Sequence, residues 1–243
     1  MREPRLLFRH NRLDHGRSPA AGHGGSAARD RHRGRAAVGG ARPYGAALGE
    51  PARQPASVGH PTTGLHFAHA PQLGFVMALA VVGTVDALAG PGTAVKWPND
   101  IMRDSAKLAG ILLETCDDGT VLAGTGVNVR HSPPGMPYPV TCLQDLGCDA
   151  SAPDVMDRLL AELRLEWDAW QSTGFGPVLQ RWCERGPLPG AALRVRTGSR
   201  VLSGRFAGLR ADGALLLQTA ETLHAIVAGD VQPCAGADVC PER

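Results

Sequence analysis

The sequence predicts an α+β fold, with a mixed, largely antiparallel sheet and helices in one domain and a small β-barrel at the C-terminal end. Three observations lead to this prediction. Residues 73–88 form a long apolar stretch, residues 93–130 contain several short alternating segments, and a second series of such segments follows residue 190. A chain of 243 residues has room for a domain of about 150 residues and a smaller companion.

Three helices are expected. Residues 73–88 (LGFVMALAVVGTVDAL) are long and apolar enough for a buried helix, and the sequence AGPG at 89–92 ends it. A second helix opens at Ala152-Pro153-Asp154, and its apolar side chains recur at helical spacing as far as Trp170. After a glycine break, a shorter helix is expected at about residues 176–184, whereas residues 131–150 are rich in loop formers.

The strands of the larger domain are expected to be consecutive neighbours. Residues 93–97 (TAVKW) alternate as a strand, and residues 101–103 and 107–115 form a hairpin around Asp104-Ser105. A further turn at residues 117–119 leads into a strand at 121–130. These patterns predict three or four adjacent antiparallel strands.

The C-terminal part is expected to be a separate small barrel. Residues 185–190 (RGPLPG) form a linker, and the segments ALRVRTG, RVLSGRFAGLR, GALLLQT and LHAIVAGDV then give four or five short strands between glycine-containing turns. The predicted division of the chain is therefore an aberrant Arg/Gly/Ala-rich segment at 1–60, expected to be disordered and without helices or strands, a larger domain at 61–188 and the small barrel at 189–236.

Composition excludes several classes of protein. The chain is 43% apolar and 20% charged, and we expect no membrane partner because no window approaches about 18 consecutive apolar residues. The six cysteines show no CxxC spacing, which argues against a zinc site or a disulfide framework. No apolar signal-peptide core follows the N-terminal arginines, so we expect reduced thiols and a cytoplasmic location.

Charge is distributed unevenly along the chain. Residues 1–60 carry a net charge of +7 and the remainder −5, and Gly, Pro, Ala and Arg fill 37 of the first 60 positions. Only Lys96 and Lys107 among the 25 basic residues are lysines. A lysine kept in so arginine-rich a chain suggests a need for a compact, movable ammonium, although chance would also explain two lysines.

Three segments near the middle of the chain carry the candidate chemistry. KWPNDI (96–101) ends a strand, KLAGILLE (107–114) forms the next, and AGTGVNV (123–129) places Gly124 and Gly126 on one face of a neighbouring strand. Such glycines let a flat ligand approach the backbone. Each segment taken alone also has a structural explanation: a turn, a solvated lysine and a β-bulge.

In this order and spacing, the three segments resemble the catalytic core of the biotin protein ligases. The segment GRFAGLRADGALLLQT (204–219) is similar to the SH3-like domain that closes the catalytic domain in this family. The resemblance covers about residues 62–235 and lacks an N-terminal helix-turn-helix, so it is to the monofunctional form without a DNA-binding domain. Lipoate ligases share the superfamily fold, but KWPND favours biotin.

The resemblance implies an ATP-dependent ligase. Its substrate would be biotin, its cofactors ATP and Mg²⁺, its intermediate biotinyl-5'-AMP, and its partner a biotin carboxyl carrier protein or domain of acetyl-CoA carboxylase. Lys107 matches the family's catalytic lysine, which stabilises charge that develops between the biotin carboxylate and the α-phosphate. The implied biotin-binding residues are Lys107, Trp97, Gly110, Gly124 and Gly126, and the implied ATP- and Mg²⁺-binding residues are Asn99, Asp100 and Asn128, with Asp100 as the metal ligand.

The chain departs from the family in its first sixty residues. Neither the family's DSTN motif nor its biotin-binding loop GRGRxGRxW occurs there. Back-translation of residues 31–60, read one nucleotide forward with permissible codons, gives AIEAERQSAGRGRMGRRWVSPPGNLQASV, and the same shift at residues 8–15 gives SATIDSTM. We therefore hypothesise that residues 1–60 are a frame-displaced translation of the biotin-loop region, through a real mutation or an error in the gene sequence.

Two other interpretations of the chain stay open. It could be a catalytically impaired ligase remnant that retains nucleotide or carrier docking. Less in keeping with the sequence, residues 1–60 could be a basic arm that binds nucleic acid through phosphate contacts, although that segment lacks lysine and interleaved aromatic residues.

Overall fold

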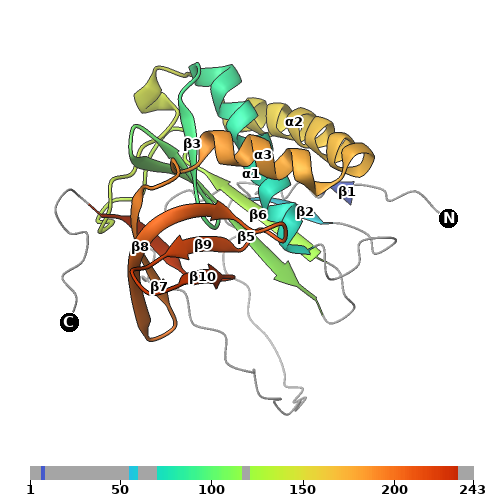
Figure 1. Cartoon of the computed structure of the whole chain (residues 1–243). Coiled ribbons are helices and arrows are strands. Elements are labelled where there is room, and N and C mark those ends of the chain that lie inside the picture. The colour runs from blue at the N-terminus through green and yellow to red at the C-terminus, as the bar shows by residue number, and fades with distance from the viewer. Residues whose placement is uncertain (1–6, 9–54, 60–69, 117–120, 235–243) are drawn as a thin grey trace, which may run out of the picture.

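A computed structural model describes residues 7–8, 55–59, 70–116 and 121–234, with side chains for the last two ranges (Figure 1). The predicted α+β fold is confirmed. A six-stranded sheet has the order β1-β2-β6-β5-β4-β3, and every pair of neighbouring strands is antiparallel. Its strands are β1 (Leu7–Phe8), β2 (Pro55–Gly59), β3 (Thr93–Lys96), β4 (Asp100–Arg103), β5 (Ala106–Thr115) and β6 (Val121–Val127).

Three helices cover one face of this sheet, as Figure 1 shows. They are α1 (Ala70–Ala89), α2 (Ala152–Thr173) and α3 (Phe175–Arg185), close to the expected positions. Ser151 caps α2 by accepting a hydrogen bond from the Asp154 amide, and Asp154 in turn accepts from Ser151. The Ser151 hydrogen bonds lower the pKa of Asp154. This capping box fixes the predicted start of the helix.

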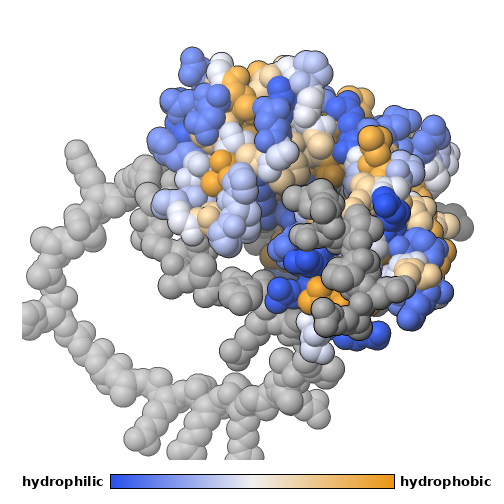
Figure 2. Space-filling model, turned by 60° about the vertical axis from the view of Figure 1, so that its left-hand side comes forward, coloured by the Kyte–Doolittle hydropathy of each residue, from blue (hydrophilic) through white to orange (hydrophobic). Residues whose placement is uncertain are grey.

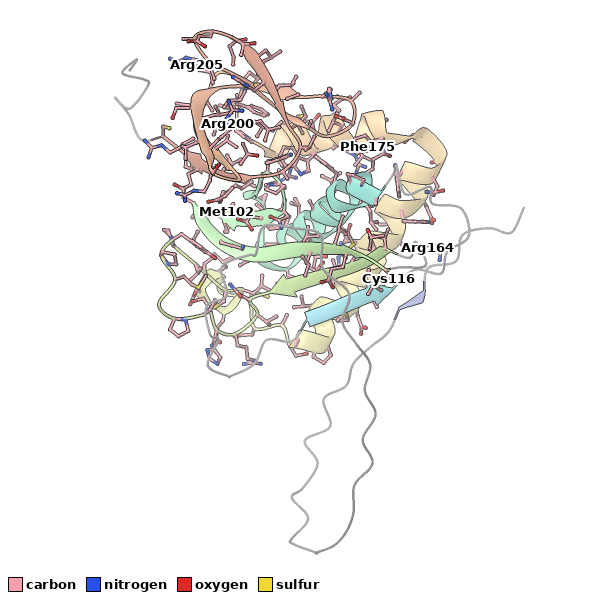
Figure 3. The ribbon with its side chains drawn as sticks, turned by 90° about the horizontal axis from the view of Figure 1, so that it is seen from below. Met102, Cys116, Arg164, Phe175, Arg200 and Arg205 are labelled. Carbon is pink, nitrogen blue, oxygen red and sulfur yellow. The ribbon has the colours of Figure 1, made fainter. Side chains whose placement is uncertain are left out.

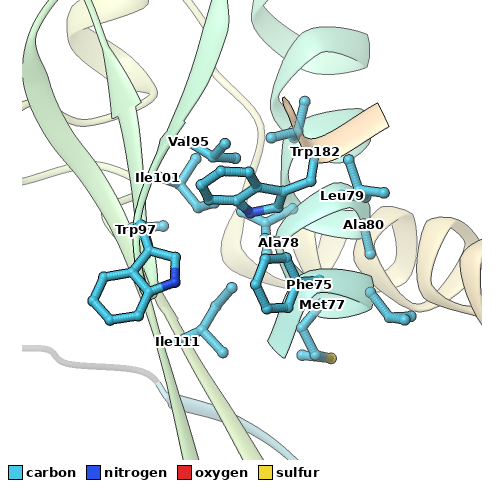
Figure 4. Packing of buried hydrophobic residues seen from close by; sticks show 14 of the residues in the cluster. Phe75, Met77, Ala78, Leu79, Ala80, Val95, Trp97, Ile101, Ile111 and Trp182 are labelled. Atoms are coloured by element: carbon cyan, nitrogen blue, oxygen red, sulfur yellow. The ribbon is translucent and has the colours of Figure 1, made fainter. Parts of the chain in front are cut away.

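Helix α1 forms the centre of the core. Leu73, Val76, Met77 and Val81 on it are at most 1% exposed. Figure 4 shows the Trp182 ring of α3 between α1, with Phe75 beside it, and strand residues such as Val95 and Ile101. By length and composition α1 could also cross a membrane, contrary to the sequence prediction that no stretch of this kind is present, but 61% of its most apolar window is buried in this fold.

The hairpin between β4 and β5 is confirmed, and it contains a bulge. Asp104 and Ser105 at its tip both have positive φ (47° and 64°), as a two-residue type I′ turn requires. Ile101 pairs with Ala109 but Met102 pairs with Lys107, so Leu108 is an extra residue in β5. An extra residue of this kind shifts the alternation of side chains along the strand, so that residues before it point to the opposite face of the sheet from the one they would otherwise occupy.

The C-terminal strands form the predicted barrel, in the order β10-β9-β8-β7-β11. They are β7 (Ala192–Thr197), β8 (Arg200–Leu209), β9 (Leu215–Gln218), β10 (Leu223–Ile226) and β11 (Asp230–Pro233). Their inward side chains belong to the same continuous apolar cluster as α1 and the large sheet. The barrel is therefore packed onto the first domain and does not hang from it by a linker alone.

The turn between β8 and β9 contacts the first domain. The Trp97 indole N–H donates to the Gly213 carbonyl at 3.1 Å, and the Gly213 Cα lies against Phe75. Asp212 in this turn pairs with Arg210 and accepts from the Ala214 amide. The Arg210 hydrogen bond is the main reason that the pKa of Asp212 is lowered to about 2.

Replacing Gly213 with alanine is expected to lower the free energy of unfolding by about 2–4 kcal/mol. A Cβ there would lie 2.6 Å from Cε2 of Phe75, and the residue has a φ of +89° that a side chain disfavours. Gly190→Ala is the matched control, because Gly190 has a φ of +84° but, among the residues that the structure describes, no atom within 4 Å of its would-be Cβ. Chemical denaturation of both variants separates the cost of steric overlap with Phe75 from the cost of backbone strain. An equal decrease in the free energy of unfolding in the two variants would contradict tight packing at Phe75.

Some details differ from the sequence prediction. The segment 1–60 was expected to contain no regular element, yet Leu7–Phe8 and Pro55–Gly59 form strands, the second of which pairs with β6. Strand β6 ends at Val127 rather than at residue 130. The expected turn at residues 117–119 lies outside the described residues. The five described cysteines are free, and burial raises the pKa of the Cys142 and Cys183 thiols.

Candidate functional site

The face of the sheet opposite the helices carries the predicted site. The strand registers place Lys96 beside Asp100, Asp100 beside Gly110, and Gly110 beside Gly126, so these four residues form one row across β3, β4, β5 and β6. Side chains in one such row point to the same face of a sheet. The pairing therefore brings together residues from all three motif segments.

Lys107 joins this row because of the bulge in β5. In a regular strand Lys107 would face the opposite side from Gly110, since the two are an odd number of residues apart. The extra residue Leu108 is instead turned into the core, where it is 0% exposed, and the Lys107 ammonium lies over the Gly110 backbone. A Cβ added to Gly110 would be 3.4 Å from both Cε and Nζ of Lys107. A larger residue at 110 would therefore crowd the lysine.

Asp100 holds both lysines of the chain. Its Oδ1 lies 2.5 Å from Nζ of Lys107, and its Oδ2 lies 3.3 Å from Nζ of Lys96. The Asp100 side chain is only 16% exposed, so these contacts are partly shielded from water. Lys107 Nζ also lies 5.8 Å from the ring centroid of Tyr138, on the loop that follows β6. The site thus presents a partly buried cluster with two cations and one anion.

Asn99 and Asn128 hold the backbone beside this cluster. The Asn99 side-chain amide donates to the Ile111 carbonyl at 2.7 Å, while the Asn128 amide donates to the Thr141 carbonyl at 2.9 Å. The Lys107 amide itself donates to the Pro139 carbonyl. Both asparagines therefore lie beside this cluster, and their N–H groups fix strand β5 and the loop that follows β6. Nucleotide binding by their remaining side-chain oxygens stays a prediction.

Beyond Lys107 the open face is apolar and lacks bulky side chains at two positions. Gly124 pairs with Leu112, and both lie on the same face as Gly126. Leu112 is 57% exposed and Leu122 is 40% exposed, which is unusual for leucines on a sheet. Sequence reasoning missed these two leucines, although their spacing from Gly110 and Gly124 in β5 and β6 would have placed them on this face.

Trp97 differs from its predicted role. The sequence suggested that it forms a flat wall of the biotin pocket, but the structure places it in the core, 3% exposed, with its N–H bonded to the barrel. Figure 4 shows the ring beside strand residues at the edge of the packed cluster. Pro98 after it cannot extend the strand pairing, and strand β3 ends at Lys96. The described contacts of Trp97 thus connect the first domain to the barrel.

The described residues do not form a magnesium site on their own. Mg²⁺ is usually held by one or two carboxylates together with substrate phosphates. Asp100 is the predicted ligand, but its two oxygens each face an ammonium group, and the described residues contain no cluster of three His, Cys, Asp or Glu side chains that could hold a metal. Binding of Mg²⁺ remains a prediction.

Similarity to known proteins bears directly on this site. Residues 190–232 match the family described as "Biotin protein ligase C terminal domain". A biotin--[acetyl-CoA-carboxylase] ligase from Paracoccus denitrificans is 35% identical over 175 residues, which cover 67% of this chain and 72% of that protein. The chain belongs to the biotin protein ligase family.

Other members of the family agree with this assignment. The bifunctional ligase/repressor BirA of Bacillus subtilis is 29% identical over 171 residues, and the chain spans about half of it (53%). The structure of the biotin protein ligase from Aquifex aeolicus superposes with a TM-score of 0.66 at 20% identity, covering 74% of this chain and 83% of that one. The same ligase has been solved in complex with biotin and ATP, with a TM-score of 0.63. These structures establish that the family fold is present.

Proposed function

We propose that this chain activates biotin with ATP and transfers it to a lysine of a biotin carboxyl carrier protein or domain of acetyl-CoA carboxylase. One observation carries the proposal: the Lys107 ammonium lies over the Gly110 backbone on an open, partly apolar sheet face in a chain of this family. The apolar part of the face suits the ring system of biotin, and the cationic part suits its carboxylate and the ATP phosphates. The Aquifex ligase solved with biotin and ATP supports the same ligands.

The reaction has two steps in this proposal. A carboxylate oxygen of biotin attacks the α-phosphorus of ATP, the bond to the β-phosphate oxygen breaks, and pyrophosphate leaves with its electron pair. A neutral carrier lysine then attacks the acyl carbon of biotinyl-5'-AMP, which forms an amide and releases AMP and a proton. The first step brings two anions together, so a cation between them lowers the barrier. Lys107 supplies that cation.

Held by Asp100, Lys107 is oriented before substrate arrives. The contact of Nζ with Oδ1 leaves other N–H groups of the ammonium to donate to incoming oxygens, since an ammonium has three donors. Mg²⁺ would enter with ATP, bound mainly by its phosphates. We place the reaction in the cytoplasm, where reduced cysteines and ATP occur together.

Two assays test the function. Biotin-dependent release of pyrophosphate from ATP measures the first step, and incorporation of labelled biotin into a purified carrier domain measures the second. A carrier domain whose acceptor lysine is replaced by arginine is the control. Pyrophosphate release without transfer would support activation alone. Nucleotide binding without either step would favour the alternative that the chain is a catalytically impaired ligase remnant. The absence of the GRGRxGRxW loop is consistent with that alternative.

The substitution Gly126→Val is expected to reduce biotin binding by about tenfold or more without loss of stability. No described residue lies within 4 Å of a Cβ at position 126, and valine suits a strand, so we expect the fold to tolerate the change. The added methyl groups would stand on the open face where the ligand is proposed to lie. Calorimetric titration with biotin and a thermal melt check both parts.

The matched control for this variant is Thr115→Val. Thr115 is exposed at the far end of β5, where it pairs with Val121, and it lies away from Lys107. Both variants add apolar surface to a strand of the same sheet. Equal biotin affinity in the parent chain and Gly126→Val would place the ligand elsewhere.

A further inference from the structure

We infer that Lys96 is a positioning residue, through which the C-terminal barrel sets the orientation of Asp100 and so the position of Lys107. The inference rests on the proposed function of Lys107 and adds a residue that the motif match did not assign. Lys96 Nζ lies 3.3 Å from Oδ2 of Asp100 and 3.6 Å from Oδ1 of Asp230. It is therefore shared between the candidate site and strand β11 of the barrel.

The charges form an alternating series from the barrel to the site. Asp230, Lys96, Asp100 and Lys107 follow one another with separations of 3.6, 3.3 and 2.5 Å. Asp230 is 57% exposed, but Lys96, Asp100 and Lys107 are only 27%, 16% and 28% exposed. Water screens the outer contact most, and the inner contacts remain strong because they are shielded.

Each of the two carboxylate oxygens of Asp100 contacts a different lysine. Lys96 can therefore control how Asp100 holds Lys107. While Lys96 holds Oδ2, only Oδ1 is directed at Lys107. Without Lys96 the carboxylate is free to turn and to bind Lys107 through both oxygens. Lys107 would then be held more tightly by Asp100 and would be less free to meet an incoming carboxylate or phosphate. The loss of Lys96 therefore affects the chemical step more than the apolar part of ligand binding.

The barrel end of the series is also fixed in place. Asp230 opens strand β11, pairs with Arg196 of β7 in the register, and accepts a hydrogen bond from Gln232 at its other oxygen. The Trp97–Gly213 contact holds the barrel next to the residue that follows Lys96. Figure 3 shows the barrel, with Arg200 and Arg205 on it, directly above the part of the sheet that carries Met102. A shift of the barrel is thus transmitted to Lys96 by a short path.

The first test uses the full chain and needs no activity. Because the sequence contains two lysines, labelling with ¹³C- and ¹⁵N-lysine gives one side-chain signal each for Lys96 and Lys107. Replacing each lysine in turn assigns them. Asp230→Asn is expected to shift the Lys107 signal, although Asp230 does not touch Lys107, and Lys96→Gln is expected to shift it further in the same direction.

Glu221→Gln is the matched control for Asp230→Asn. It removes the same charge from an exposed position on the same barrel, and Glu221 makes no ion pair among the described residues. It is expected to leave both lysine signals in place. The inference would be overturned if Asp230→Asn moved the Lys96 signal but left the Lys107 signal fixed. Asp230 would then contact Lys96 without affecting the position of Lys107.

The second test is kinetic and uses a chain with the biotin loop in frame. Lys96→Gln is expected to lower kcat for pyrophosphate release about tenfold, with the KM for biotin changed less than about twofold, the size of one lost charge-assisted contact. Lys96→Arg should restore most of the rate because it keeps the charge. Arg200→Gln, which removes an exposed cation from the barrel, should have no effect.

A double-mutant cycle completes the test. Asp230→Asn alone is expected to reduce kcat about two- to threefold, and to add nothing when Lys96 is already glutamine, since coupled residues are not additive. If the effects of the two substitutions on kcat were fully additive, Asp230 would not act through Lys96, and the inference would be wrong. If no variant or parent releases pyrophosphate, the proposed function fails, whereas the lysine signals still decide whether Lys96 positions Lys107.

Discussion

A chain whose codons before Pro61 are read one nucleotide forward is expected to bind biotin about 100-fold more tightly than the chain as written, a gain of about 2.7 kcal/mol. The shifted reading restores a GRGRMGRRW segment, which matches the family's biotin loop and brings arginines to the anionic ligand. The described face offers a floor with Gly110, Gly124 and Gly126 but is open above, with Leu112 57% exposed. A small ligand is normally enclosed over most of its surface.

Isothermal titration of biotin into both proteins measures this difference. A third protein, with the restored frame but GRGRMGRRW changed to GSGSMGSSW, is the control that separates the loop's charge from its mere presence. Tight biotin binding by the chain as written, with residues 1–60 protected from protease, would contradict the frame-shift hypothesis. The nucleotide sequence upstream of Pro61 provides an independent check.

Replacing Lys107 with alanine in the frame-restored protein is expected to slow adenylate formation by about 10²–10³-fold, as for the loss of one donor to a developing oxyanion. The expected effect on stability is small. Lys107 is 28% exposed, its alkyl chain lies over Gly110, and its loss leaves Asp100 still paired with Lys96. Single-turnover release of pyrophosphate gives the rate, and a thermal melt gives the stability.

Lys107→Arg provides the matching comparison. It keeps the charge but replaces a compact ammonium with a larger planar group over the glycine floor, so we expect it to recover little of the rate. Asp86→Asn, on the helix side of the sheet, should lower stability without changing the rate of the folded protein, because Asp86 pairs with Arg103 and Arg185 there. An unchanged rate in Lys107→Ala would remove this residue from the mechanism.

Much of the fold could be predicted because its signals are local. The Asp104-Ser105 turn, the Ser151 capping residue and the glycine turns of the barrel each follow from the chemistry of a few consecutive residues. Contacts between distant parts of the chain could not be predicted in this way. Trp97 is in the core because Gly213, 116 residues later, accepts its N–H.

The candidate site divides along the same line. Lys107, Asp100 and the glycines were identified from their motifs, but the role of Lys96 depends on Asp230, which reaches it only when the barrel is packed in place. The rarity of lysine marked Lys96 without saying what it contacts. Exposed apolar residues alone do not mark the site: Figure 2 shows them scattered among polar ones on the face in view, and it is the spacing of Leu112 and Leu122 from the glycines, fixed by the strand registers, that places them beside it.

The bulge at Leu108 has a consequence for how relatives of this chain should be aligned. Because one extra residue turns Lys107 toward Asp100, the number of residues between these two positions matters as much as their identity. Deletion of the extra residue between Lys107 and Gly110 would send the lysine to the helix side, even in a sequence that keeps the residues on both sides of it. A gap in this interval of an alignment is therefore a sharper sign of lost activity than several substitutions.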